Sequence, residues 1–126
     1  MRISEVSEKY CISKDTLRYY EKLKMLKPDR IGGKREYSIS ECKKLKSILQ
    51  LKKLMFTLSV IKEMLEVDER VDRDIYNGVI KDEDLELLKN MIAYKYDHIR
   101  QLEADIQIAK GELKAIEKKI EIISKG

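Results

Sequence analysis

The sequence is poor in the residues on which turns and β-rich folds depend. Its 126 residues include one proline and five glycines, and aromatic residues make up only 6%. A β-sandwich or β-barrel needs more turn-forming and aromatic residues than this. Because 43% of the residues are hydrophobic and 40% are charged, the composition predicts a mainly helical protein. The length allows one compact domain, or a small domain followed by a long helix.

The sequence also has few metal-binding residues and no long apolar runs. Two cysteines, Cys11 and Cys42, and the single histidine, His98, are too few for a disulfide scaffold, a four-cysteine zinc site or an iron–sulfur cluster. No apolar run is long enough to span a membrane, and the charged N-terminus is unlike a secretion signal. We therefore expect a cytoplasmic protein with reduced thiols, without a metal or other cofactor and without a membrane partner.

Catalytic groups do not stand out either. The histidine is isolated, and no nucleophile, glycine-rich phosphate loop or carboxylate pair is evident in the sequence. The sequence therefore does not indicate an enzyme.

The net charge of +4 conceals an uneven distribution along the chain. Residues 1–67 contain 16 Lys and Arg against 9 Asp and Glu, a net charge of +7, whereas residues 68–126 contain 11 against 14, a net charge of −3. A basic first half favours a polyanionic partner, with double-stranded DNA the leading candidate. Charge alone does not distinguish a DNA-binding surface from a basic surface that only contacts solvent.

The second half carries the a/d pattern of a coiled coil, with spacings of three and four residues throughout. The pattern predicts a helix over 83–123, capped by Asp82 and about 60 Å long. One apolar stripe on so long a helix cannot be buried within its own chain, so we expect a homodimer, with parallel and antiparallel strands both open. Lys95 and Ala109 occupy two core positions; the others are Leu85, Leu88, Ile92, Ile99, Leu102, Ile106, Leu113, Ile116, Ile120 and Ile123.

The first half begins with two short predicted helices, over residues 4–10 and 14–23, around a tight turn. This is a helix-turn-helix arrangement, in which the second helix enters the major groove of DNA. Lys14 and Thr16 are placed to reach base edges, and Arg18 and Tyr19 are suited to backbone phosphates. A solvated basic helix face is the alternative interpretation of this helix taken alone.

A predicted β-hairpin follows Pro28, with Gly32-Gly33 as its two-residue turn. A small exposed hairpin gains no stability from clustered cations, whereas a phosphate surface or minor groove would explain them. The clustered residues are Arg30, Lys34, Arg35 and Tyr37. Further along the chain, Lys52 is a candidate for another phosphate contact, with a solvated helix face as the alternative.

Two more helices complete the first half. Ser38 and Glu41 form a capping-box pattern that starts a third helix ending near Leu54, and Thr57 caps a fourth over 58–66. Residues 68–81 read as a charged connector. We therefore expect a winged helix-turn-helix domain over 1–67, a connector over 68–82 and a dimerisation helix over 83–126.

The motifs of the first half resemble those of a known family. The segment from Ile3 to Leu65 looks like the DNA-binding domain of MerR-type bacterial transcriptional regulators. The most specific motif is TLRYYE (residues 16–21) followed by Leu26-Lys27-Pro28. A wing ending in Arg35-Glu36-Tyr37 supports the resemblance, as does Phe56-Thr57-Leu58 at the start of a helix.

The resemblance implies a homodimer with an antiparallel coiled coil of C-terminal helices. It also implies binding to a pseudo-palindromic promoter operator, and distortion of the DNA so that RNA polymerase can engage the promoter. Carried over by position, Arg18, Tyr19, Arg35 and Tyr37 become phosphate contacts, Arg30 a wing contact, and Lys14 and Thr16 the base-reading end.

The sequence departs from the family pattern at three turn positions. The family usually has glycine where this chain has Cys11, Lys24 and Met55, so each turn requires a non-glycine residue at a less favourable φ or a changed local geometry. The wing has Lys34 where the family usually has tyrosine. These departures affect the details of docking rather than the fold.

The sequence is also compatible with two other functions. One is an architectural, excisionase-like DNA-binding protein with the same winged helix, and the other is a coiled-coil module that docks a protein partner. Thiolate metal sensing is disfavoured because no cysteine follows Cys42. Core packing is the favoured role for Cys42 itself.

Overall fold

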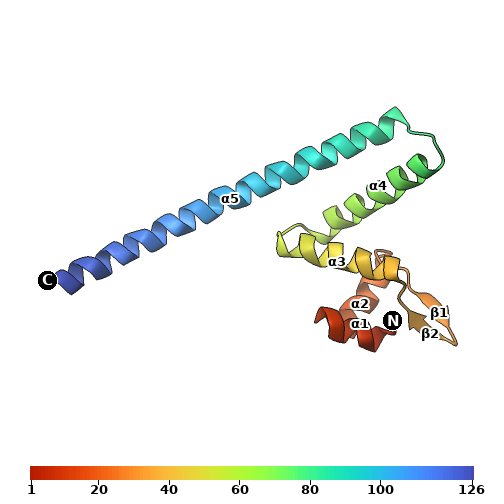
Figure 1. Ribbon diagram of the computed structural model, residues 1–126, viewed down its shortest axis with the longest axis horizontal. Helices are drawn as coiled ribbons and strands as arrows, with labels where there is room; N and C mark the ends of the chain where they lie inside the picture. Colours follow the sequence, from red (N-terminus) through yellow and green to blue (C-terminus); the bar gives the residue numbers. More distant parts are fainter. The chain divides into compact units, whose positions relative to one another are not determined.

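The computed structural model describes all residues from Met1 to Gly126 and divides into two units, Met1–Asp72 and Arg73–Gly126. It has five helices and a two-stranded wing (Figure 1), which confirms the predicted mainly helical, winged helix-turn-helix fold with a long C-terminal helix. In chain order the elements are α1 (Ile3–Tyr10), α2 (Lys14–Lys22), β1 (Asp29–Ile31), β2 (Lys34–Glu36), α3 (Ile39–Lys53), α4 (Leu58–Tyr76) and α5 (Asp82–Lys125).

The starts of α2, α3 and α4 follow the capping residues that the sequence predicts. The Ser13 hydroxyl accepts a hydrogen bond from the Thr16 backbone N–H at 3.1 Å, and Ser38 does the same for Glu41 at 3.1 Å. Thr57 accepts from the backbone N–H of Val60 at 3.4 Å. These bonds satisfy backbone donors that have no partner within the first helical turn.

The second half of the predicted capping box in α3 is used differently. The Glu41 carboxylate accepts a hydrogen bond from the backbone N–H of Lys27 at 2.8 Å and contacts the Lys44 ammonium at 3.1 Å. Lys44 also pairs with Glu69 of α4 at 2.8 Å. Burial alone would lower the pKa of Lys44, but the hydrogen bonds to Glu69 and Glu41 raise it. Glu41 therefore ties the loop before the wing to α3, and Lys44 ties α3 to α4.

Three turns have a left-handed backbone at a residue other than glycine. Cys11, Lys24 and Met55 have φ of 53°, 62° and 67°, and no other non-glycine residue has a positive φ. Cys11 ends α1, where its backbone N–H bonds to the Glu8 carbonyl. The turns therefore keep a geometry that suits glycine although other residues occupy them.

The wing is an antiparallel hairpin whose register pairs Arg30 with Arg35. Its two-residue turn is Gly32-Gly33, with φ of 58° and 76°. Positive φ at both central positions matches the turn type that fits the twist of paired strands, and glycine adopts it without strain. The predicted hairpin is thus confirmed, with three residues in each strand.

The helix predicted over 58–66 is too short, because α4 continues to Tyr76. Ile61, Met64, Asp68, Val71 and Ile75 keep a three-and-four spacing through the charged stretch, and no glycine or proline interrupts it. The helix ends where Gly78 adopts a φ of 71° and the Val79 N–H bonds back to the Asp74 carbonyl at 2.9 Å. More than half of the predicted connector over 68–82 is therefore helical.

The hydrophobic core lies within the first unit and is formed by residues of α1, α2, α3 and α4 and of the segments between them. It includes Cys42, which confirms the predicted packing role, whereas Cys11 is exposed. The buried apolar side chains are Val6, Leu17, Tyr20, Met25, Leu26, Tyr37, Cys42, Leu45, Ile48, Phe56, Ile61 and Met64. Burying such side chains is the main source of stability for a unit of this size.

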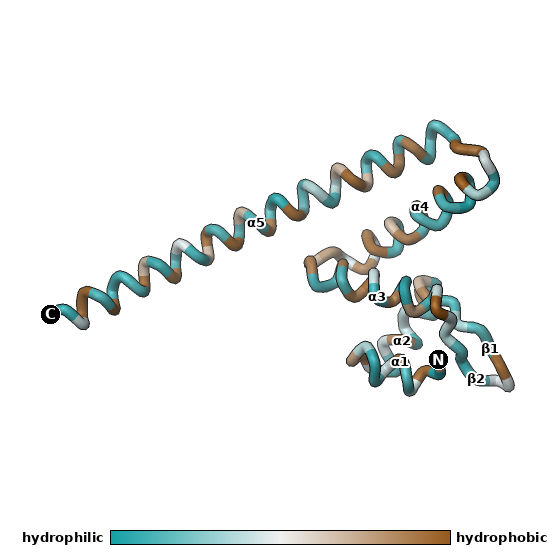
Figure 2. The backbone as a smooth tube through the Cα atoms, viewed as in Figure 1, coloured by the Kyte–Doolittle hydropathy of each residue, from teal (hydrophilic) through white to brown (hydrophobic).

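Helix α5 is a single uninterrupted helix of 44 residues, close to the predicted span. Apolar and polar residues alternate along its whole length in Figure 2. Seven of the predicted core residues have exposed fractions from 43% to 77%: Leu85, Ile92, Ile106, Leu113, Ile116, Ile120 and Ile123. The apolar stripe is therefore largely uncovered in the single chain. None of the helices is apolar enough over a sufficient length to cross a membrane.

Candidate nucleic-acid interface

The base-reading end predicted for α2 lies at its first turn. The Lys14 side chain is exposed, while Thr16 is half-buried and its hydroxyl lies 2.7 Å from the Ser13 hydroxyl. Because Ser13 caps the helix through the Thr16 N–H, the two hydroxyls form one polar group at the helix start. Lys14 is the freer of the two predicted base-contacting side chains.

The next turn of α2 presents an arginine and a tyrosine. The Arg18 guanidinium bonds to Asp15 at 2.9 Å, in a pair whose aspartate is 94% exposed. A pair this exposed contributes little to stability, so water and salt compete with it readily. Tyr19 is 48% exposed. Leu17 and Tyr20 of the same helix are buried, so Arg18 and Tyr19 occupy the outward face.

The wing arginines are held by a carboxylate from α2. The Arg35 Nε lies 2.6 Å from one oxygen of Glu21, and an Arg30 Nη lies 3.2 Å from the other. The side chains of Arg35 and Glu21 are 22% and 24% exposed, so this contact is more sheltered than the Arg18–Asp15 pair. Glu21 thereby joins the second helix of the helix-turn-helix to both strands of the wing.

Tyr37 takes a different place from the one expected. Its side chain is 1% exposed and its hydroxyl is buried without a hydrogen-bond partner. Burial raises the pKa of this hydroxyl, with the nearby Glu21 carboxylate adding to the rise. The ring belongs to the core at the base of the wing, so Tyr37 is not an exposed phosphate contact in this conformation.

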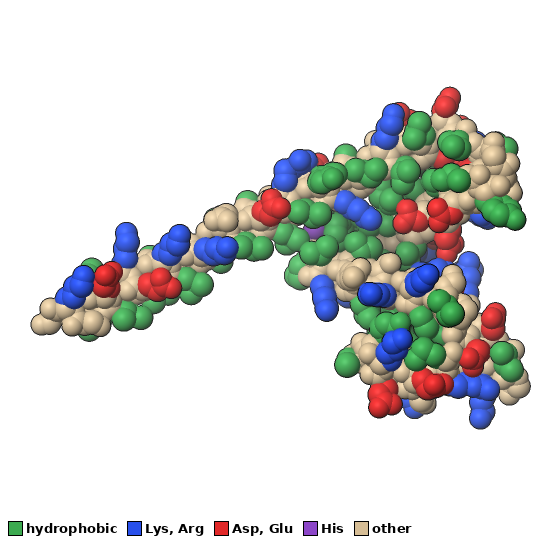
Figure 3. Space-filling model, in the orientation of Figure 1, with side chains coloured by type: hydrophobic (Ala, Val, Ile, Leu, Met, Phe, Trp, Pro, Cys, Tyr) green, Lys and Arg blue, Asp and Glu red, His purple; other side chains and the backbone are tan.

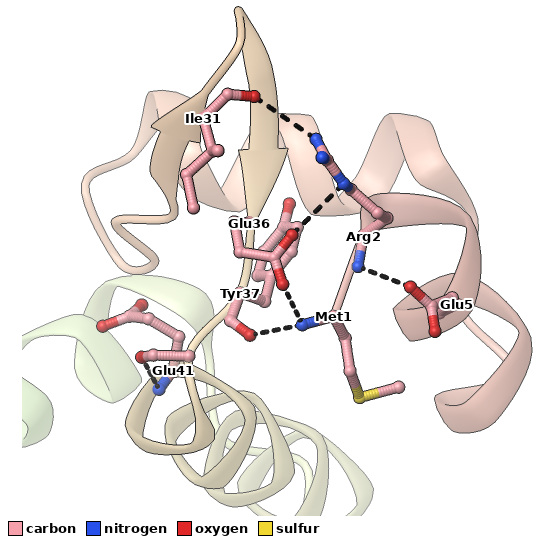
Figure 4. Close-up of polar contacts among 8 residues, drawn as sticks. Met1, Arg2, Glu5, Ile31, Glu36, Tyr37 and Glu41 are labelled. Carbon is pink, nitrogen blue, oxygen red and sulfur yellow. Dashed lines mark hydrogen bonds and ion pairs between the residues drawn. The ribbon is translucent and has the colours of Figure 1, made fainter.

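The first two residues of the chain extend the wing, as Figure 4 shows. The Met1 ammonium donates to the Glu36 carboxylate at 2.7 Å and to the Tyr37 carbonyl at 2.9 Å, and the Tyr37 N–H donates to the Met1 carbonyl at 2.7 Å. Arg2 contacts the second oxygen of Glu36 at 3.3 Å and donates to the Ile31 carbonyl at 3.4 Å. The wing is therefore attached on one side to α2 and on the other to the start of the chain.

These contacts shift the pKa values of both charged groups at the wing base. The hydrogen bond from the Met1 ammonium lowers the pKa of Glu36, and the same bond raises the pKa of the Met1 amino group. Both shifts favour the charged pair at neutral pH.

A shallow cavity of about 470 Å³ lies beside this attachment, lined by Arg2, Ile3, Ser4, Arg30, Gly33, Lys34 and Arg35. It collects four cations from the start of α1 and from both strands of the wing. Figure 3 shows Lys and Arg side chains of the winged unit interspersed with acidic ones on the face in view. The cavity is therefore one place on the winged unit where cations gather.

The structure brings most of the predicted residues of α2 and the wing into one unit. The charges of Arg35, Arg30 and Arg18 each act to lower the pKa of Tyr37, while Lys34 lies at the wing tip. Lys52 is exposed near the end of α3. Whether these side chains contact a nucleic acid stays a prediction.

Sequence reasoning missed the residues that position this surface. Glu21 stood inside the motif that carried the family resemblance, yet nothing in its spacing pointed to a partner nine and fourteen residues away. Met1, Arg2 and Glu36 left no signal either, because a single isolated bridge between Arg2 and Glu36 has no period to detect. No group of three or more potential metal ligands occurs in the structure.

Comparison with known proteins gives consistent likenesses. A family model described as "MerR HTH family regulatory protein" matches residues 1–67. The mercuric resistance operon regulatory protein of Bacillus cereus is 37% identical over 91 residues, covering 68% of this chain and 69% of that protein. The HTH-type transcriptional regulator ZntR of Escherichia coli K12 is 37% identical over 73 residues, covering 56% of this chain and only half of ZntR.

Solved structures share the fold over nearly the whole chain. HiNmlR, described as a MerR family regulator that lacks the sensor domain and is bound to promoter DNA, has a TM-score of 0.66 and 25% identity. The match covers 93% of this chain and 90% of that one. A MerR-type protein from Listeria monocytogenes covers 98% of this chain and 96% of that one with a TM-score of 0.53, and at 20% identity it supports the fold alone.

Proposed function

Because this chain belongs to the MerR family of helix-turn-helix regulatory proteins, we propose that it binds a pseudo-palindromic promoter operator as a homodimer and controls transcription. The observation that carries the proposal is the union of α2 and the wing in one unit, with Glu21 holding Arg30 and Arg35 beside the exposed face of α2. A recognition helix with an adjoining basic wing suits the major groove and its flanking phosphates.

The residues of α2, the wing and α3 that are predicted to contact DNA divide into two proposed roles. Lys14 and Thr16 contact base edges at the helix start, where the major groove carries a distinct pattern for each base pair. The phosphate contacts, which fix the register of the protein on DNA, come from Arg18, Tyr19, Arg30, Lys34, Arg35 and Lys52. The burial of Tyr37 supports a role in holding the wing instead.

The proposed dimer forms through α5, in an antiparallel coiled coil. The uncovered a/d residues of α5 support this arrangement, because so long an apolar stripe is costly to leave in water. Lys95 supports the antiparallel order, since a parallel pair would place two lysine side chains opposite each other in one core layer. Two antiparallel helices also place two winged units at separate half-sites, which a pseudo-palindromic operator requires.

Control of transcription is proposed to operate through the shape of the promoter. Two winged units on one dimer can hold the DNA bent and untwisted, at an energetic cost that depends on sequence. RNA polymerase would then engage the distorted promoter. We place this activity in the cytoplasm, together with the proposed DNA partner.

The test uses the full chain and a DNA duplex selected by that chain from a random-sequence library. Arg18→Ala combined with Arg35→Ala removes four proposed phosphate contacts from the dimer. We expect affinity at physiological salt to fall more than about 100-fold, with a shallower dependence on salt concentration. Binding is measured by fluorescence anisotropy, and dimerisation is checked by analytical ultracentrifugation.

Two control variants accompany this test. Lys114→Ala combined with Lys118→Ala removes the same number of cations from the exposed outer face of α5 and is expected to bind like the wild type. Tyr37→Phe, which removes a buried unpaired hydroxyl, is expected to keep full affinity. Should the arginine variant bind as tightly as the lysine control, the assigned surface is wrong.

A further inference from the structure

Glu21 is an acidic residue in the middle of the surface proposed to face DNA. It lies in α2 between the exposed Tyr19 and the end of the helix, and its carboxylate contacts two wing arginines. A negative charge close to a phosphate backbone opposes binding, because like charges repel across a short distance. A favourable effect of Glu21 on DNA binding would have to offset this repulsion.

The geometry of the Arg35 contact indicates what that role is. Glu21 accepts a hydrogen bond from the Nε of Arg35 at 2.6 Å, and the two terminal nitrogens of that guanidinium have no hydrogen-bond partner in the structure. An arginine offers its donors in a rigid planar fork, so fixing Nε also fixes the direction of the two terminal nitrogens. Arg35 is thus held in one orientation with its outer donors still available.

The second contact of Glu21 extends this arrangement across the wing. Its other oxygen bonds to an Arg30 Nη at 3.2 Å, and Arg30 pairs with Arg35 across the hairpin. One carboxylate therefore separates two like charges that face each other on neighbouring strands. Without it, the two guanidinium groups would repel each other directly.

We propose that Glu21 is a positioning residue for DNA binding: it fixes the wing to α2 and aims Arg35 and Arg30 at backbone phosphates. This inference rests on the proposed function and names a part of that site which the sequence did not reveal. Glu21 repels the DNA phosphates, which weakens binding. It also holds two arginines in place before binding, so that they lose less conformational entropy when the complex forms, and we infer that this second effect is the larger.

Positioning by Glu21 and simple charge repulsion predict opposite changes in DNA affinity when Glu21 is neutralised. Glu21→Gln removes a negative charge from the DNA-facing surface, which by charge alone would tighten binding. If Glu21 positions the arginines, the same change weakens binding by roughly tenfold, since charge-assisted hydrogen bonds to arginine are lost. The measurement is the affinity of the full chain for the selected duplex and for a scrambled duplex of equal length.

The Asp15–Arg18 pair provides a matched control on the same helix. Asp15→Asn also removes one negative charge that contacts an arginine, but Asp15 is 94% exposed and holds no second element. We expect this variant to bind as the wild type does or about twofold more tightly. Glu21→Gln and Asp15→Asn should therefore differ in the direction of their effect.

A double-mutant cycle separates positioning from a general loss of structure. In a chain that already carries Arg35→Ala, Glu21→Gln should cost much less affinity than it does in the wild type, because its principal partner is gone. Thermal unfolding of each variant, followed by circular dichroism, confirms that the fold is retained. An undiminished cost in the Arg35→Ala chain would overturn the proposal.

The outcomes also distinguish this inference from the proposed function. If the wild-type chain selects no duplex, the proposed function fails and the inference fails with it. If the wild type binds and Glu21→Gln binds equally well or more tightly, the function stands and the positioning role of Glu21 is wrong.

Discussion

Cys11, Lys24 and Met55 each hold a left-handed backbone conformation without being glycine. This conformation places the Cβ atom close to the following carbonyl and costs roughly 1–2 kcal/mol. Glycine avoids that cost, although its greater freedom in the unfolded chain offsets part of the gain. The three turns therefore store strain that substitution can release.

Lys24→Gly and Met55→Gly are each expected to raise the free energy of unfolding by about 0.5–1 kcal/mol. Both side chains are exposed, so little packing is lost with them. Urea unfolding of the full chain measures the change. Lys24→Ala and Met55→Ala keep the Cβ and serve as matched controls, and they should show no gain. A gain of equal size in the alanine variants would show that the backbone conformation is not its source.

Single residues were predictable from the sequence where a local rule determines their place. Ser13 as a helix cap and the Gly32-Gly33 turn follow from backbone donors and from φ, which nearby residues decide. Tyr37 and Glu21 were not predictable in this way. Their surroundings are set by the wing and α2 packing together, and distant residues such as Arg30 decide whether a side chain is buried or bonded.

At the scale of elements, the beginnings of helices were easier to predict than the end of α4. Capping side chains mark the starts of α2, α3 and α4, whereas α5 begins after Lys81 and the cap predicted at Asp82 is not formed. Residues 67–76 are highly charged, which is why the sequence predicts a connector there. The helix continues because an exposed face can carry charges while the opposite face keeps its apolar spacing. The attachment of Met1 and Arg2 to the wing gave no sequence signal at all.

The attachment of Met1 to Glu36 makes the stability of the wing dependent on pH. The pKa of the Met1 amino group is raised above 8.0, so its contribution is complete below pH 8.0 and is lost as the pH rises through the raised value. The pKa of Glu36 is lowered below 4.5, so its contribution is complete above pH 4.5 and is lost as the pH falls through the lowered value. The contact is therefore at full strength from pH 4.5 to 8.0.

Glu36→Gln removes this charged contact while keeping the size of the side chain. We expect its thermal midpoint to lie below that of the wild type by a constant amount between pH 4.5 and 8.0, and the gap to narrow outside that window. Glu8→Gln, which removes an exposed carboxylate from the same region of the chain, serves as the control. A gap for Glu36→Gln that persists unchanged well above pH 8.0 would contradict the assigned role of the ammonium.

At the scale of the whole molecule, the chain consists of a basic part, residues 1–67, and an acidic part, residues 68–126, that contains α5. Their opposite charges sum to the small total of +4. The basic part is the one that we propose binds DNA, and the acidic part contains the helix that we propose forms the dimer. The long helix was predictable because its spacing of three and four residues is kept over twelve successive core positions. The way two chains meet depends on a second copy, and neither a periodic pattern nor the structure of one chain contains it.

Two isoleucines of α5 test the proposed dimer, because they lie two residues apart on different faces. Ile106 is a core position of the a/d pattern and Ile108 lies outside it, with exposed fractions of 52% and 64% in the single chain. Ile106→Asp places a charge in the buried seam of each helix and should weaken dimerisation at least about 100-fold, since desolvating an unpaired carboxylate costs several kcal/mol. Ile108→Asp introduces the same charge on the outer face and should leave the dimer intact.

Sedimentation equilibrium over a range of protein concentrations measures both variants. Weakened dimerisation should also reduce operator affinity for Ile106→Asp alone, because two linked winged units bind two half-sites far more tightly than one unit binds one. Circular dichroism checks that α5 remains helical in both chains. If the two variants dissociate equally, or if neither does, the apolar a/d stripe of α5 is not the seam that joins the two chains.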